Sequence, residues 1–177
     1  WGVLGALTDR AGGLGGVARQ FPAVGIVRLT GSDSFVDPIL IDRLITSIAA
    51  EEECDYACCT LSDGRPAHES RMGIFADWCR SEAILKANRL ARSAADRAEP
   101  MQFICSRPNV FNIKHVPVPA RLDRGDLRLA IRDEEDWENV ETILDALGPE
   151  SLDWPVIKSL RDRKPKICQR MAEQKRG

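Results

Sequence analysis

The chain has 177 residues, of which 44% are hydrophobic and 29% charged, and its formal net charge is −2. This size and composition are typical of one globular domain with its own core. The near-neutral charge argues against a general binder of nucleic acid or of membrane surfaces. No apolar run reaches the roughly 18 residues that a membrane span needs, so none is expected.

The first half of the chain predicts a loop or weak helix, then a strand, then a helix. Residues 11–19, AGGLGGVAR, lack both the Lys-Ser/Thr of a Walker A loop and the G-x-G-x-x-G spacing, so a phosphate cradle is disfavoured. Residues 23–31, AVGIVRLTG, indicate a buried strand. Asp37 as N-cap and Pro38 at the first helical position then predict a helix start.

Residues 54–61, CDYACCTL, predict the next strand, because Cys54, Tyr56 and Cys58 alternate along an apolar run. The six cysteines offer no second pair that would complete a zinc site. Buried, reduced strand cysteines are therefore the favoured interpretation, which fits a protein of the reducing cytoplasm.

The second half of the chain continues the alternation of strands and helices. Residues 71–79 and 126–133 predict strands, and the prolines of 111–119 place a third strand at a sheet edge. Helices are expected at 80–95, with Ser81 as a plausible cap, at 99–108, at 133–148 and at 151–163, and residues 160–177 form a basic terminal helix or tail. This order indicates an α/β domain.

Three stretches, in this order, are similar to motifs of one known family. Residues 27–38, VRLTGSDSFVDP, are similar to a family stretch VRITGDCPLIDP. Residues 73–84, GIFADWCRSEAI, are similar to GLDVEVF-x-x-EAL, and residues 127–138, LRLAIRDEEDWE, to LRLTVDTPEDLE. With these motifs the chain resembles the cytidylyltransferases of the CMP-sugar synthetase and spore-coat polysaccharide type, and the likeness runs over essentially residues 17–160.

The resemblance implies a nucleotide-diphospho-sugar transferase fold of the glycosyltransferase-A-like kind, with a mainly parallel sheet between helical layers. It makes residues 1–177 a single, incomplete nucleotidyltransferase-like domain, because the Gly-rich loop that opens the family's fold is not present. The strands that remain would have an unpaired edge, so marginal stability is expected.

For function, the resemblance implies transfer of CMP from CTP to an acidic sugar in surface-polysaccharide biosynthesis, with Mg²⁺ aligning the phosphates. The expected partners are CTP or a related nucleotide and the sugar, with no nucleic acid and no membrane, and a homodimer is allowed. The positions carried over as catalytic are Arg28, Ser32, Asp77 and Arg132, and those carried over as metal ligands are Asp33 and Asp133.

The chain departs from the family at its acidic positions. Without gaps, three family aspartates fall on Ser32, Phe75 and Arg132, and the family glutamate of GLDVE becomes Asp77. Asp33 and Asp133 each lie one place after the expected position, and Asp133 also suits the N-cap of the helix that follows it. Arg132 puts a positive charge where a cation is expected and suits direct phosphate binding.

Three functions therefore stay open on the sequence: an active cytidylyltransferase, a catalytically inactive relative that acts as a binding or interaction module, and a different nucleotide-sugar-dependent transferase on the same fold. The departures favour the second for catalysis. The matched motifs, which are of the cytidylyl type, disfavour the third.

Overall fold

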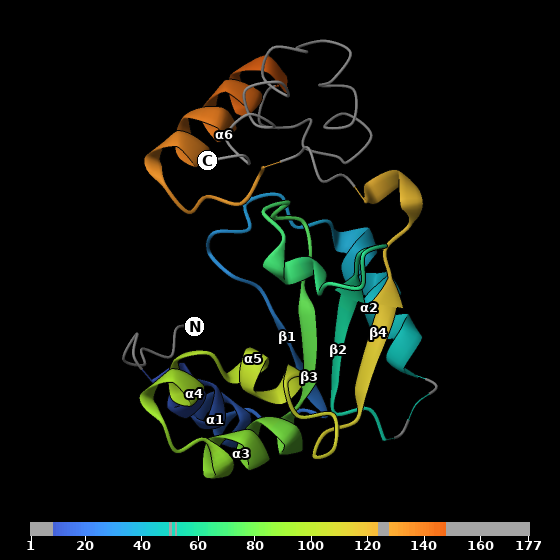
Figure 1. Ribbon diagram of the computed structural model, residues 1–177, viewed down its shortest axis with the longest axis vertical. Helices are drawn as coiled ribbons and strands as arrows, with labels where there is room; N and C mark the ends of the chain where they lie inside the picture. Colours follow the sequence, from blue (N-terminus) through green and yellow to red (C-terminus); the bar gives the residue numbers. More distant parts are fainter. Residues whose placement is uncertain (1–8, 50, 52, 124–127, 148–177) are drawn as a thin grey trace. The chain divides into compact units, whose positions relative to one another are not determined.

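The computed structural model describes residues 9–49, 51, 53–123 and 128–147 (Figure 1). The chain divides into two compact units, each assembled from several segments. The first comprises Trp1–Arg28, Leu44–Cys58 and Asp77–Val116, and the second Leu29–Arg43, Cys59–Ala76 and Pro117–Gly177. The expected alternation of strands and helices is confirmed, and the fold is α/β.

Four strands form one sheet in the order β1-β3-β2-β4, with bounds Gly25–Arg28 for β1, Tyr56–Thr60 for β2, Asp77–Arg80 for β3 and Ile113–Pro117 for β4. Strand β3 is antiparallel to both β1 and β2. Strands β2 and β4 run in the same direction, because backbone hydrogen bonds join Tyr56 to Asn112 at one end and Thr60 to Val118 at the other. Strand β4 lies at the sheet edge, as its prolines predict.

The sheet is therefore mixed, and the expected mainly parallel arrangement is not what these four strands have. Strands β1, β2 and β4 share one direction and β3 opposes them. The connection from β2 to β3 explains the reversal, since it carries only the short 3₁₀ helix η1 (Ala67–Glu69). A parallel connection usually crosses one face of the sheet with an α-helix, which residues 61–76 do not contain.

In the first unit, helices cover both faces of the sheet. Helices α1 (Arg10–Gln20), α3 (Ser81–Leu90), α4 (Ala94–Ala98) and α5 (Pro100–Cys105) gather in one group (Figure 1). Side chains of α3 and α5 pack against Tyr56, Cys58 and Cys79 on one sheet face. Alternation along β2 turns Ala57 to the other face, where it meets Leu44 and Ile48 of α2 (Pro38–Ala49).

The second unit has its own apolar core around the segments that connect the strands. It includes η2 (Ala120–Leu122) and α6 (Glu134–Leu147). Phe35, Leu40, Leu61, Met72, Ile74, Phe75, Leu122, Leu129, Val140 and Ile143 are among the buried residues of this core.

Helix starts follow the sequence closely. The Asp37 side chain accepts a hydrogen bond from the Ile39 backbone N–H at 2.8 Å, which confirms the predicted cap of α2. Ser81 is instead the first residue of α3, and its hydroxyl donates to the Ala23 carbonyl at 2.7 Å. The Gly-rich stretch is helical, as α1, and the Asp9 side chain caps it.

Two predicted strands are shorter than expected or not formed. Only Asp77–Arg80 of residues 71–79 is a strand. The described part of 126–133 makes a single bridge, between Ala130 and Asp33, instead of a strand. The predicted helix at 151–163 and the basic tail 160–177 lie outside the described residues.

The predicted burial of the cysteines around β2 is confirmed for the described part of the chain. Cys54, Cys58, Cys59 and Cys79 are buried thiols, and Cys105 is a partly exposed one. Of the helices described, none combines the length and apolar character that crossing a membrane requires.

Candidate functional site

The segments that carry the three matched motifs are joined by backbone hydrogen bonds within the second unit. The Phe35 N–H donates to the Gly73 carbonyl and the Asp37 N–H to the Ile74 carbonyl, both at 3.2 Å. These bonds hold residues 30–37 against residues 70–75, although a helix and a strand separate the two segments in the chain.

The third segment, residues 128–133, joins both of the others. The Leu129 and Ala130 N–H groups donate to the Arg71 carbonyl at 2.8 and 2.9 Å. The Ile131 N–H donates to the Ser32 carbonyl at 2.8 Å. Three distant parts of the sequence thus form one backbone scaffold, and we define residues 30–37, 70–75 and 128–133 as the candidate site of this unit.

Gly73 is required for this close packing. Its φ is +65°, a conformation that L side chains rarely adopt. A Cβ at this position would lie 2.6 Å from the Ala130 backbone nitrogen. The glycine therefore lets the second and third segments approach each other.

Arg28 and Asp77, both predicted as catalytic, form an ion pair in the first unit. They are partners in the β1–β3 register, and Arg28 Nε donates to Asp77 Oδ2 at 3.1 Å. The Arg28 Nη2 group also donates to Asp77 Oδ2. The Asp77 side chain is 3% exposed and that of Arg28 23%, so a buried carboxylate orients a guanidinium that reaches solvent.

Tyr56 adds a buried hydroxyl to the same sheet face. The residue has no exposed surface, and among the described residues its hydroxyl has no hydrogen-bond partner. Burial, reinforced by the Asp77 carboxylate, holds the pKa of this hydroxyl above its usual range. Tyr56 is therefore neutral, and it cannot serve as a base.

Ser32 and Asp33 lie in the turn after β1. The Thr30 hydroxyl donates to the Asp33 carboxylate, and the Ser32 hydroxyl donates to Thr30 Oγ1 at 3.3 Å. Asp33 also forms the bridge with Ala130. The turn thus joins the third segment through its backbone. The Thr30 hydroxyl takes up one hydrogen-bonding position of the Asp33 carboxylate.

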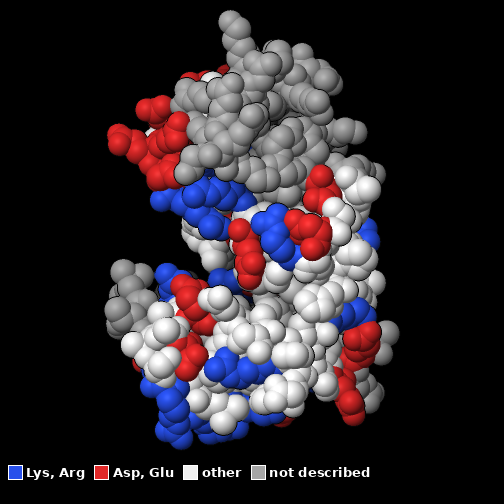
Figure 2. Space-filling model, viewed as in Figure 1, with Lys and Arg blue, Asp and Glu red and all other residues white. Residues whose placement is uncertain are grey.

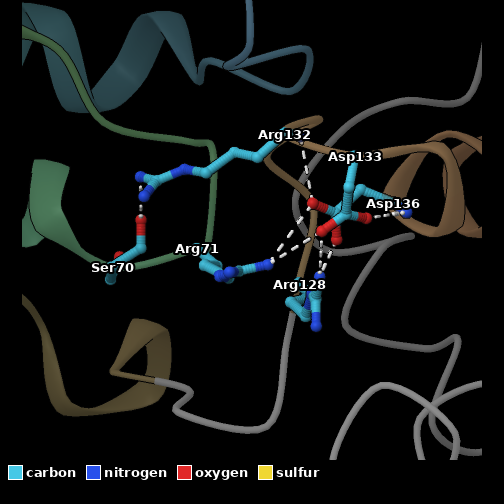
Figure 3. A network of polar contacts seen from close by, with 6 residues as sticks. All are labelled: Ser70, Arg71, Arg128, Arg132, Asp133 and Asp136. Carbon is cyan, nitrogen blue, oxygen red and sulfur yellow. Dashed lines mark hydrogen bonds and ion pairs between the residues drawn. The ribbon is translucent and has the colours of Figure 1, made fainter. Parts of the chain in front are cut away.

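Arg132 and Asp133, the other two predicted residues of this unit, belong to a polar network at the start of α6 (Figure 3). Asp133 Oδ2 accepts from Arg128 Nη2 at 2.9 Å and from Arg71 Nη1 at 3.3 Å. Asp136 is fully buried, and its Oδ1 accepts from Arg128 Nε at 2.6 Å. The Asp136 carboxylate holds the pKa of the Arg128 guanidinium above its usual range.

Asp133 also caps α6, as its sequence position predicts. Its Oδ1 accepts from the Asp136 backbone N–H at 2.9 Å. This bond, followed by the charges of Arg128 and Arg71, lowers the pKa of the Asp133 carboxyl. Arg132 turns toward the second segment, where its Nη2 donates to the Ser70 carbonyl at 3.3 Å.

Phe75, which stands at a family aspartate position, is a core residue. It is 3% exposed and belongs to the same apolar cluster as Ile74 and Leu129. A carboxylate could not occupy that place without losing its hydration.

These residues do not fit the magnesium ion that the resemblance implies. Mg²⁺ prefers carboxylate oxygens together with several waters. Here Asp133 is bound by two arginines and by a helix N-terminus, and Asp33 by Thr30. In the described ranges, no group of three or more His, Cys, Asp or Glu side chains is arranged to hold a metal.

Sequence reasoning missed Arg71, Arg128 and Asp136, which build most of the network. A signal for two of them was present, because the arginine and the second aspartate of LRLTVDTPEDLE are matched by Arg128 and Asp136. Arg71 carried no such signal, since its contact to Asp133 depends on the packing of Gly73.

The first unit also contains a pocket of about 430 Å³ lined by Glu51, Glu53, Cys54, Asn112, Ile113 and Lys114. None of the predicted site residues lines it. Lys114 pairs with Glu51 at its wall, so we interpret this pocket as a surface hollow beside an ion pair.

Comparison with known proteins supports the resemblance that the motifs indicate. No protein-family model matches the chain. Over 124 residues, 70% of this chain, it is 23% identical to the spore coat polysaccharide biosynthesis protein SpsF of Bacillus subtilis (strain 168), and it spans about half (48%) of the length of that relative. This is a distant homology.

The fold is similar to that of a cytidylyltransferase from Leptospira borgpetersenii serovar Hardjo-bovis (strain JB197). The TM-score is 0.76, with 18% identity, and the match covers 93% of this chain and 67% of that one. The chain therefore has a cytidylyltransferase-like α/β fold, and the predicted resemblance is confirmed at this level.

Proposed function

We propose that the protein containing this chain is a cytidylyltransferase-like transferase, which moves CMP from CTP to an acidic sugar in the synthesis of a surface polysaccharide. In that reaction a sugar hydroxyl oxygen forms a bond to the α-phosphorus, the bond from that phosphorus to pyrophosphate breaks, and the hydroxyl proton passes to solvent. The observation that carries the proposal is the joining of three matched motif segments into one scaffold, on a fold similar to that of a cytidylyltransferase.

Arg28 is the residue of the first unit best suited to the substrate's negative charge. Asp77 fixes its guanidinium from the buried side, and the 23% exposure of its side chain leaves a route to solvent. A guanidinium held in this way loses little further entropy when it binds a phosphate or carboxylate. We assign Arg28 as an anion-binding residue and Asp77 as its positioning residue.

Arg132 and Ser32 are the corresponding residues of the second unit. Arg132 is exposed and is fixed at its backbone, where its N–H donates to Asp136 Oδ2 at 3.0 Å. Ser32 lies in the turn that the Ile131 N–H contacts. Both side chains can donate hydrogen bonds to a phosphate or a sugar, and such hydrogen bonds do not require a metal.

A second candidate function is a catalytically inactive relative that binds a nucleotide or a partner protein. The buried Phe75 and the arginine at position 132 favour it, because both stand where the family has aspartates. The two candidates differ in pyrophosphate release, and both can include nucleotide binding.

The test is calorimetric titration of CTP, ATP, GTP and UTP into the full native protein, followed by a screen of acidic sugars for pyrophosphate release from CTP. We expect CTP to bind most tightly. Arg132→Ala should weaken binding about tenfold or more, since a hydrogen bond to a charged group contributes about 1.5–3 kcal/mol. Arg92→Ala, which removes an exposed arginine outside the three segments, is the matched control.

Pyrophosphate release with one sugar would support the transferase. CTP binding without release under any sugar would favour the inactive relative. A folded protein that binds no free nucleotide would contradict the cytidylyl proposal, and binding of a sugar nucleotide in its place would favour a different transferase on the same fold.

A further inference from the structure

Two acidic side chains in and beside the candidate site, those of Asp133 and Asp136, are paired with arginines, and these pairs oppose the binding of a metal ion. The relevant carboxylates, those of Asp33, Asp133 and Asp136, all belong to the second unit. A divalent cation would have to coordinate their oxygens in place of their present partners.

Asp136 is inaccessible to a cation. It has no exposed surface. Its Oδ1 accepts from Arg128, and its Oδ2 accepts from the Arg132 backbone N–H, with Arg71 Nη1 at 3.6 Å. A metal that entered would break a buried pair and leave a buried guanidinium uncompensated, which is costly.

Asp133 is exposed but already serves three donors. Its Oδ1 accepts from the α6 N-terminus, and its Oδ2 from Arg128 and Arg71. A carboxylate keeps further lone pairs, so geometry alone does not exclude a metal. Electrostatic repulsion does exclude a metal ion, because the guanidinium groups of Arg128 and Arg71 lie within hydrogen-bonding distance of Asp133 Oδ2, the oxygen that a cation would need.

The charge of the whole network points the same way. The guanidinium groups of Arg71 and Arg128 pair with the carboxylates of Asp133 and Asp136, and the Arg132 guanidinium extends from the same network to the Ser70 carbonyl (Figure 3). The two negative charges that would attract a dication are therefore already balanced by two guanidinium groups, and each of these attractions strengthens as the site loses water. Asp33, whose carboxylate Thr30 engages, would contribute at most one remaining ligand.

We infer that this chain has exchanged a metal site for an arginine–aspartate network, so that the candidate site binds no divalent cation and its fixed positive charge comes from arginine. The inference concerns the free protein and does not depend on the proposed transferase activity. The site geometry shows only that the carboxylates present do not suit Mg²⁺. The inference adds that the arginines are what excludes the divalent cation.

The experiment measures binding of Mn²⁺ to the nucleotide-free full native protein by the loss of the free-ion electron paramagnetic resonance signal. Arg132→Asp restores a carboxylate at the family position and removes a positive charge that the network holds. Arg92→Asp makes the same charge change at an exposed site outside the three segments and is the matched control. Circular dichroism establishes that each variant is folded.

We expect no saturable Mn²⁺ binding by the native protein or by Arg92→Asp at millimolar Mn²⁺. Arg132→Asp should bind about tenfold more tightly or better, from the change of two charge units near a dication. Saturable binding by the native protein that Asp33→Asn or Asp133→Asn abolishes would overturn the inference. So would a folded Arg132→Asp that binds no more tightly than Arg92→Asp.

Discussion

Asp133 combines two roles, because its Oδ1 caps α6 while its Oδ2 pairs with Arg128 and Arg71. Its place before an acidic helical turn predicts a cap, and the bond to the Asp136 N–H confirms it. The metal-ligand role came from the resemblance, and stays a prediction that the contacts to Arg71 and Arg128 oppose. Those contacts link segments far apart in the chain, so no local pattern could have revealed them.

The two roles of Asp133 can be separated by pH. The Asp136 N–H, Arg128 and Arg71 lower its pKa below the ordinary value of 3.8. A carboxyl with a lowered folded-state pKa contributes stability above its unfolded-state pKa, and that stability is lost as pH falls through the folded-state value. We expect Asp133→Asn, which keeps a cap but removes the charge, to be less stable than the native protein at neutral pH.

Urea denaturation from neutral pH down to about pH 2 checks this, with the difference shrinking below about pH 4. Asp133→Ala removes the cap as well and should be less stable than Asp133→Asn at every pH. A native-minus-Asn difference that stays constant down to the lowest pH would assign the effect to packing and contradict the ion-pair contribution.

Among the elements, the helices were easier to predict than the strands. The caps of α2 and α6 are local signals, and both are present. Residues 126–133 have the alternation of a strand, but the Leu129 and Ala130 N–H groups both bond to the single Arg71 carbonyl, so no ladder forms there. Alternation predicts an extended backbone, and it contains no information about whether a neighbouring strand is available.

The approach of residues 70–75 to residues 128–133 depends on Gly73. Gly73→Ala adds a Cβ 2.6 Å from the Ala130 nitrogen at a φ of +65°. We expect it to lower the free energy of unfolding by about 1–3 kcal/mol, from backbone strain and displacement of the adjoining segment. Chemical denaturation measures the change.

Gly31→Ala is the matched control, because nothing lies within 4 Å of a Cβ at that position and its φ is ordinary. It should change stability by no more than about 0.5 kcal/mol. Equal effects of the two substitutions would mean that the close approach at Gly73 is not what stabilises the scaffold.

At the scale of the whole molecule, the near-neutral net charge follows directly from the composition. On the face drawn in Figure 2, basic and acidic side chains lie beside one another over much of the described surface, in keeping with the net charge of −2. The α/β class also followed from the order of elements. The mixed direction of the sheet did not, because it depends on the connection between β2 and β3, which contains no α-helix that could cross over the sheet.

The cysteines report on the intact fold. Cys54, Cys58, Cys59 and Cys79 are each less than 7% exposed, whereas Cys105 is partly exposed. Burial raises the pKa of the Cys54 and Cys79 thiols, so little thiolate forms there. Among the five cysteines that the structure describes, we expect iodoacetamide under native conditions to modify Cys105 first and the four buried thiols only as fast as the protein unfolds.

Peptide mapping by mass spectrometry after timed labelling gives each rate separately. Denaturant should bring the five rates together, which provides the internal control. Modification of Cys58 or Cys79 at the native rate of Cys105 would show that the sheet opens without global unfolding.

The joining of three distant segments also determines when the second unit can be completed during synthesis. Residues 30–37 and 70–75 leave the ribosome well before residues 128–133, and Leu129, Val140 and Ile143 of the same apolar core are made last. Until then Phe35, Met72 and Ile74 lack these partners, and exposed apolar surface of this kind favours aggregation. The candidate site is therefore completed late, by closure of long loops, and we expect the nascent chain to be most prone to aggregation just before α6 emerges.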